Sequence, residues 1–152
     1  MKKQIIILEQ IDKKILHLKK IEDLTIPSSG WVYAIRQALG MSLRQLGKKM
    51  EITPQSVKEI EEREKSGSIS LNVLRQFGKC LDLKLVYGFV SKQITLEKMI
   101  EKRALELAKE IVMRTSMSMK LEDQENNPKR IQKAIDEKAK EIKFEMPKYL
   151  WD

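Results

Sequence analysis

The sequence predicts a mostly α-helical protein with a central bundle of four short helices, flanking helices and one β-strand. Proline and glycine are scarce, with 4 and 6 residues among 152. Over most of the chain, apolar residues recur every three or four positions, which is the period of a helix. Aromatic residues make up only 5% of the chain, so we expect a core built from Ile, Leu, Val and Met.

The N-terminal segment, residues 1–26, is expected to form a helix over residues 4–24. Its apolar residues follow 3-4-3 spacing at Leu8, Ile11, Ile15 and Leu18. This stripe covers barely two heptads, which is too short for an independent coiled coil. We therefore expect the helix to pack on its own chain or on a second copy. A turn is expected at residues 27–30.

Four short helices are predicted within residues 31–81. The first runs from Trp31 to Leu39 and is followed by Gly40, a residue type common after a helix end. Its apolar side is expected to consist of Trp31, Ala34, Ile35 and Ala38. The second begins with a capping box of Ser42 and Gln45. The last covers residues 71–81 and is expected to pack through Leu71, Leu74, Phe77 and Leu81.

A β-strand is predicted over residues 83–90, because this run is rich in β-branched and aromatic residues. Its expected inner face consists of Leu83, Leu85, Tyr87 and Phe89. A lone strand needs a partner, and the sequence offers no second strand. The same strand of a second copy can supply it by two-fold symmetry, so we expect a homodimer joined partly by an antiparallel ladder.

Residues 91–152 are expected to form a C-terminal helical extension. Thr95 can cap a long helix that runs to about Met119. The Asn-Asn-Pro run at residues 126–128 ends it, and a second amphipathic helix is expected over residues 129–144.

Residues 43–62 fit a helix-turn-helix, in which two short helices pack around a tight corner. Apolar residues stand where the helices must contact each other, at Leu46, Met50, Ile52, Val57 and Ile60. Gly47 provides the small residue at the crossing, and Thr53 and Pro54 suit the start of the second helix. Glu51 stands where such corners usually have glycine, because the backbone passes through positive φ there. A side chain at positive φ costs about 1 kcal/mol.

The second helix of this motif exposes polar side chains that suit base edges in the major groove of DNA. Glutamine can bond adenine, lysine can bond guanine, and glutamate can accept from cytosine. Gln45 and Ser56 lie near helix N-termini and suit phosphate, while Arg44 and Lys48 add positive charge beside the backbone. The DNA-binding residues expected are Arg44, Gln45, Lys48, Thr53, Pro54, Gln55, Ser56, Lys58 and Glu59.

The net charge of the chain favours a polyanionic partner. The formal charge is +8, and residues 31–90 carry 10 Lys/Arg against 6 Asp/Glu. Such a charge raises affinity for nucleic acid, although it is also typical of a Lys-rich helical surface in contact with water. Two alternatives therefore remain. The helix-turn-helix can serve only for packing, or the chain can be a protein-interaction module whose residues 1–26 and 91–152 bind and restrain a partner.

The stretch "MSLRQLGKKMEITPQSVKEIEE" resembles the lambda-repressor-like, or XRE, helix-turn-helix regulators. This resemblance implies a lambda-repressor-like domain over residues 31–90, strand included, which reads a two-fold operator as a dimer. The whole chain also resembles the "mobile mystery protein A" family. The similar pieces are "PSSGWVYAIRQALGMSLRQLGKKM", "ITPQSVKEIEEREKSGSISLNVL", "LVYGFV", "MKLEDQ" and the terminal "LWD".

The second resemblance implies a bacterial regulator from mobile elements, encoded beside a Fic-domain protein in an antitoxin-like pair. Fic-domain enzymes are restrained by an inhibitory helix of pattern [Ser/Thr]-x-x-x-Glu-[Gly/Asn]. Residues 118–123 fit its first five positions, with Ser118 and Glu122, and depart at the sixth. We therefore consider Ser118 and Glu122 as partner-binding residues. The alternative is an ordinary solvated helix end.

Little in the sequence points to catalysis. The chain has one histidine, His17, and one cysteine, Cys80, without a glycine-rich phosphate loop. We expect no enzyme activity, no metal and no other cofactor. A lone cysteine fits the reducing cytoplasm. The apolar run at the N-terminus is interrupted by Glu9 and Asp12, too soon for a signal peptide, and no run is long enough to span a bilayer. We therefore expect a cytoplasmic protein without membrane contact.

Overall fold

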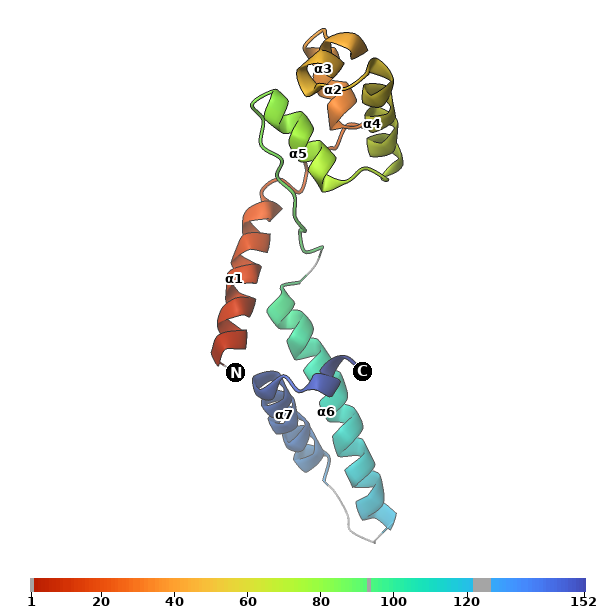
Figure 1. Ribbon diagram of the computed structural model, residues 1–152. Coiled ribbons are helices and arrows are strands. Elements are labelled where there is room, and N and C mark those ends of the chain that lie inside the picture. The colour runs from red at the N-terminus through yellow and green to blue at the C-terminus, as the bar shows by residue number, and fades with distance from the viewer. Residues whose placement is uncertain (1, 93, 122–126) are drawn as a thin grey trace. The chain divides into compact units, whose positions relative to one another are not determined.

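The computed structural model describes residues 2–92, 94–121 and 127–152, and over these residues it contains seven α-helices and one short 3₁₀ helix (Figure 1). The helices are α1 (Lys2–Lys19), α2 (Trp31–Ala38), α3 (Leu43–Met50), α4 (Pro54–Ser66), α5 (Leu71–Cys80), α6 (Leu96–Leu121), α7 (Pro128–Glu145) and the 3₁₀ helix η1 (Lys148–Trp151). The prediction of a mostly helical protein is confirmed. None of the described helices is both long and apolar enough to cross a membrane.

The chain divides into two compact units. We call residues 23–88 the central unit, and residues 1–22 together with 89–152 the flanking unit. The central unit holds α2 to α5, and the flanking unit holds α1, α6, α7 and η1.

The central unit packs around one apolar side chain from each of its four helices. These are Val32, Leu46, Val57 and Phe77, and each is at most 4% exposed. Burying a side chain of this size contributes about 1.5–3 kcal/mol relative to leaving it in water. Residues partly buried against this core include Ile35, Met50, Ile52, Ile60, Leu74 and Leu81. The predicted apolar contact between the two helices of the motif is therefore confirmed.

Three of the packing positions predicted for α2 and α5 are wrong, and one of them, Ala38, is exposed at the end of α2. Trp31 is 39% exposed, and the buried side of α2 is instead formed by Val32 and Arg36. Leu71, at the first position of α5, is 41% exposed. In an eight-residue helix a single charged residue decides how the apolar side is assigned. The predicted packing side did not include Arg36, which is buried with a partner.

The flanking unit is organised around an antiparallel pair of helices, α6 and α7, which lie side by side (Figure 1). Ile100, Ala104 and Ala108 repeat every four residues on one side of α6, and the small alanines let α7 approach closely. Ile135 and Ile142 of α7 and Leu150 of η1 complete the buried core. Where the start of α6 meets the end of α7, Lys143 Nζ lies 3.0 Å from Glu97 Oε1 and 2.6 Å from Glu101 Oε1.

Helix α1 joins this unit through a cap on a distant helix. The Asp12 carboxylate accepts hydrogen bonds from the backbone N–H groups of Leu96 (2.9 Å) and Glu97 (3.1 Å), in the first turn of α6. Thr95 Oγ1 accepts the next N–H, from Lys98, as predicted for a cap. Together the two side chains satisfy three of the donors that a helix N-terminus leaves without partners.

The predicted helix over residues 4–24 ends earlier, at Lys19. Beyond it, the N–H groups of Lys20, Ile21 and Glu22 bond carbonyls only three residues back, which is the tighter turn common at helix ends. The turn expected at residues 27–30 is present, and Gly30 there adopts a φ of 88°.

The β-strand predicted over residues 83–90 is absent, since the structure assigns no strand to these residues. A strand exists through hydrogen bonds to a neighbouring strand, and the part of the chain that the structure describes supplies no such neighbour for this segment. Instead, the Leu83 N–H bonds the Gly78 carbonyl and completes the end of α5 (2.7 Å). The Tyr87 ring lies under the Arg75 guanidinium, 5.7 Å from its centroid. β-propensity alone therefore does not make a strand here.

Candidate nucleic-acid interface

The corner between α3 and α4 has the tight geometry that the motif requires. Glu51 adopts a left-handed conformation with φ of 58° and ψ of 39°, as expected where such corners usually have glycine. Its neighbour Ile52 then donates its N–H to the Gly47 carbonyl at 2.9 Å. A Cβ added at Gly47 would lie 2.7 Å from the Ile52 carbonyl oxygen. Because only glycine fits there, α4 can cross α3 closely.

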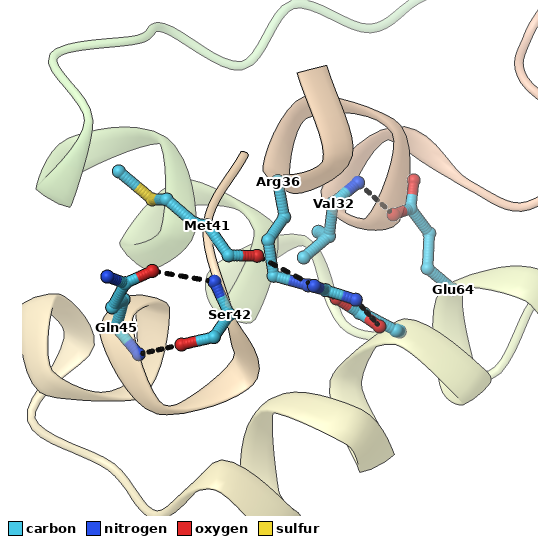
Figure 2. A network of polar contacts seen from close by, with 7 residues as sticks. Val32, Arg36, Met41, Ser42, Gln45 and Glu64 are labelled. Carbon is cyan, nitrogen blue, oxygen red and sulfur yellow. Dashed lines mark hydrogen bonds and ion pairs between the residues drawn. The ribbon is translucent and has the colours of Figure 1, made fainter. Parts of the chain in front are cut away.

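Side-chain caps fix the first turns of both helices. Ser42 Oγ accepts the Gln45 N–H at 3.1 Å, and Gln45 Oε1 accepts the Ser42 N–H at 2.8 Å (Figure 2). This is the predicted capping box. Because the amide oxygen of Gln45 is used by the cap, its NH₂ group is the part that can donate to a phosphate.

The start of α4 is held in the same way. Thr53 Oγ1 accepts the Ser56 N–H at 3.1 Å and donates to Ser56 Oγ at 2.9 Å. Pro54 occupies the first helical position, where a missing N–H costs nothing. Thr53 and Pro54 therefore shape the end of α4, and the Ser56 hydroxyl keeps its own proton for donation to an outside acceptor.

The structure leaves the predicted base-reading and charged side chains in solvent. Gln55, Lys58 and Glu59 are exposed on α4 and Arg44 and Lys48 on α3, whereas Ser56 is half-buried. Val57, on the opposite side of α4, is completely buried. The nine predicted residues thus gather on the two helices of the motif, and their contacts with DNA stay a prediction.

Two glutamates of α4 fix this helix to α2, and sequence reasoning did not identify either contact. Glu61 accepts from Arg36 Nε at 2.5 Å and from the second terminal nitrogen of the same guanidinium at 3.2 Å. Arg36 also donates to the Met41 carbonyl at 2.9 Å (Figure 2). The hydrogen bonds to Glu61 are the main cause that raises the pKa of Arg36, which therefore stays charged.

The second glutamate acts at the N-terminus of α2. The two carboxylate oxygens of Glu64 accept the N–H groups of Trp31 and Val32, each at 2.8 Å. Figure 2 shows the bond from Val32. Gly30, which precedes α2, offers no capping side chain, and the distant carboxylate takes that role. A carboxylate is also favoured at the positive end of a helix dipole. Since Glu61 and Glu64 lie three residues apart on α4, one side of this helix is fixed while the other stays free.

A hollow of about 630 Å³ lies beside α4, between the end of α3 and one side of α5. Lys49, Arg63 and Lys79 give it positive side chains, and Glu51 and Glu59 give it negative ones. Cys80 also lines it, donates to the Phe77 carbonyl and has a pKa raised mainly by burial. Burial thus keeps this thiol protonated, as expected for a packing residue.

Of the two residues considered for partner binding, the structure describes only Ser118. Ser118 is exposed on α6, and its hydroxyl donates to the Arg114 carbonyl one turn earlier. Glu122 lies outside the described residues.

Comparison with known proteins identifies the central unit. Residues 32–87 match the model of a helix-turn-helix family, HTH_3. No curated protein and no solved structure matches the chain. The matched residues begin one position into α2 and extend past α5, so they include both helices of the motif and the two that support it. Residues 32–87 therefore form an XRE-like helix-turn-helix domain.

Proposed function

We propose that this protein is a sequence-specific DNA-binding transcriptional regulator that acts as a repressor, with α4 as its recognition helix. The observation that carries the proposal is that α4, within a helix-turn-helix domain, is fixed on one side and exposes polar side chains on the other. One side is fixed to α2 by Glu61 and Glu64, its N-terminus is capped by Thr53, and its free side exposes Gln55 and Lys58. A helix held in this way can enter the major groove without first ordering itself.

In this proposal the side chains divide into two groups. Gln55 and Lys58 read base edges, with adenine and guanine as their preferred partners, and Glu59 accepts from cytosine. The Gln45 amide, the Ser56 hydroxyl, Arg44 and Lys48 bind phosphates, which fix the register of the helix on DNA. A dimer would present two such helices to a two-fold operator with half-sites about one DNA turn apart.

The resemblance to the "mobile mystery protein A" family supports a finer proposal. The protein would be a cytoplasmic, antitoxin-like repressor of its own expression, paired with a Fic-domain protein encoded nearby. Glu122 would enter the nucleotide site of that partner. Mixing the two purified proteins tests this, and full suppression of the partner by the Glu122→Gly variant would contradict the role of Glu122.

The main experiment compares binding to the DNA upstream of the gene with binding to a scrambled duplex, at low and physiological salt. We expect selective binding to the upstream DNA, weakened about tenfold or more by Gln55→Ala and by Lys58→Ala, since a good base contact is worth about 1–3 kcal/mol. Gln37→Ala and Lys84→Ala are matched controls, because both residues are exposed in the central unit outside the motif.

The alternative outcomes are separable. Equal and strongly salt-dependent binding to both duplexes would mean a basic protein without sequence preference. Absence of DNA binding at both salt concentrations would favour the interaction module, in which the flanking unit binds and restrains a partner protein.

A further inference from the structure

The flanking unit exposes more large apolar side chains than it buries. Its buried apolar core, over the described residues, consists of only six side chains. Twelve large apolar side chains are exposed in the same unit: Ile6, Ile7, Ile11, Leu16, Ile21, Phe89, Met99, Met113, Met117, Phe144, Tyr149 and Trp151. All four of its aromatic side chains are among them. Exposed apolar side chains mark an interaction site where they gather at one place.

The end of the chain is held rigidly although its aromatic side chains face solvent. Arg103 of α6 donates from Nε to the Leu150 carbonyl (2.6 Å) and from a terminal nitrogen to the Asp152 carbonyl (2.7 Å). Leu150 is buried against the α6–α7 pair, while Trp151 is 62% exposed. These bonds hold the backbone on either side of Trp151, which lowers the backbone entropy lost when a partner binds.

A hollow of about 400 Å³ adjoins this tryptophan. It is lined by Gln4, Phe144, Glu145, Met146, Pro147, Lys148, Leu150 and Trp151, and we call it the tail hollow. Phe144 is 59% exposed, so two exposed aromatic side chains stand at one recess of mixed polar and apolar lining. Exposed aromatic residues at a recess are typical of the energetic centre of a protein–protein interface.

The charges at the tail hollow are self-complementary. Glu145 and Lys148 are both exposed and carry opposite signs. In a two-fold contact, if one residue of the first copy meets another residue of the second, the reverse contact is also made. The Lys148 side chain of one copy can therefore face Glu145 of the second, and the reverse, while the aromatic side chains pack between them.

We propose that the tail hollow is the centre of a two-fold interface between two copies of this chain, with Phe144 and Trp151 as its apolar anchors and Glu145 and Lys148 as its charge pair. This deepens the dimer of the proposed function and rests on it for its biological purpose, namely the supply of two recognition helices. The interface itself needs no DNA.

The test is sedimentation equilibrium of the full chain from nanomolar to tens of micromolar concentrations. We expect a mass twice the monomer value of 17.8 kDa. Phe144→Ser and Trp151→Ala should each raise the dimer dissociation constant about tenfold or more, as anchor residues do. Leu39→Ser is the matched control, since this side chain is 55% exposed in the central unit. Circular dichroism checks that every variant keeps its helix content.

Charge reversal identifies the two-fold pairing. Glu145→Lys and Lys148→Glu should each weaken the dimer, and the double variant should restore it. A monomer at every concentration, a dimer as sensitive to Leu39→Ser as to Trp151→Ala, or a double variant no stronger than the single ones would overturn the proposal. So would a chain that stays monomeric alone and associates only with a different protein.

Failure of this inference can be told apart from failure of the proposed function. A dimer that depends on Trp151 but does not bind the upstream DNA would overturn the operator-reading role and leave the interface standing. Selective DNA binding by a protein that remains monomeric would overturn the interface and leave the DNA-binding role standing.

Discussion

Arg36 and Glu61 form a two-point ion pair in the interior of the central unit, with side chains that are only 9% and 8% exposed. The shorter of the two contacts, from Nε to Oε1, is 2.5 Å. This pair connects α2 to α4, so the orientation of α4 depends on the two-point ion pair as well as on apolar packing.

Removing one member of this pair should lower the free energy of unfolding far more than replacing both members. Glu61→Leu leaves the Arg36 charge buried without its partner, which typically costs 3–5 kcal/mol. The double variant Arg36→Met/Glu61→Leu replaces the pair with apolar side chains and should recover most of that loss. Urea unfolding of the isolated variants measures both values. Equal destabilisation by the single and double variants would contradict the buried pair.

Replacing the corner residue Glu51 with glycine should raise the stability of the domain. At φ of 58° a side chain costs about 1 kcal/mol, and Glu51→Gly removes that cost. Glu51→Ala keeps a Cβ at the same backbone angle, so it should give little gain and serves as the control. Thermal unfolding of the three proteins provides the comparison. If alanine stabilises the domain as much as glycine does, backbone strain at this corner is not the cause.

Asp12 should stabilise α6 from a distance. Asp12→Ala removes the acceptor of the Leu96 and Glu97 N–H groups, and loss of a cap costs about 1 kcal/mol. Hydrogen exchange at these two amides should quicken more than at the Lys98 amide, which Thr95 still caps. The exposed Asp23 offers a control in Asp23→Ala, for which both amides should keep their protection.

The ion pair between Lys143 and Glu101 predicts a specific pH dependence. The hydrogen bond from Lys143 holds the pKa of the Glu101 carboxyl below its ordinary value of 4.5. A lowered pKa means that this carboxylate contributes stability above that ordinary value and loses it as pH falls through the lowered one. In Lys143→Ala, NMR titration should return the pKa of Glu101 to its ordinary range. Lys140→Ala, one turn earlier and exposed, should leave it unchanged.

Local sequence patterns predicted the elements that depend on nearby residues. The Ser42–Gln45 capping box, the Thr53–Pro54 start of α4 and the left-handed corner at Glu51 all involve residues within a few positions of one another. Such features are set by short-range hydrogen bonding and sterics. They were therefore visible without knowledge of the fold.

The contacts that sequence reasoning missed join distant positions. Arg36 and Glu61 are 25 residues apart, and Asp12 caps a helix 84 residues away. Each of these charged residues alone is indistinguishable from a solvated one, because its partner is brought near only by the fold. The wrong strand at residues 83–90 has the related cause that a strand is defined by a partner, which no local pattern can supply.

The bond between Asp12 and the start of α6 also bears on the order in which the protein folds as it is made. The ribosome completes every residue of the central unit before it reaches Leu96, and α1 has no helix to cap until then. We expect the central unit to fold first and α1 to remain unattached during that interval. Protease sensitivity of chains stalled after residue 91 would show whether the N-terminal helix is open to cleavage at that stage. The helix-turn-helix domain would therefore be complete while the unit that surrounds it in the sequence is still being assembled.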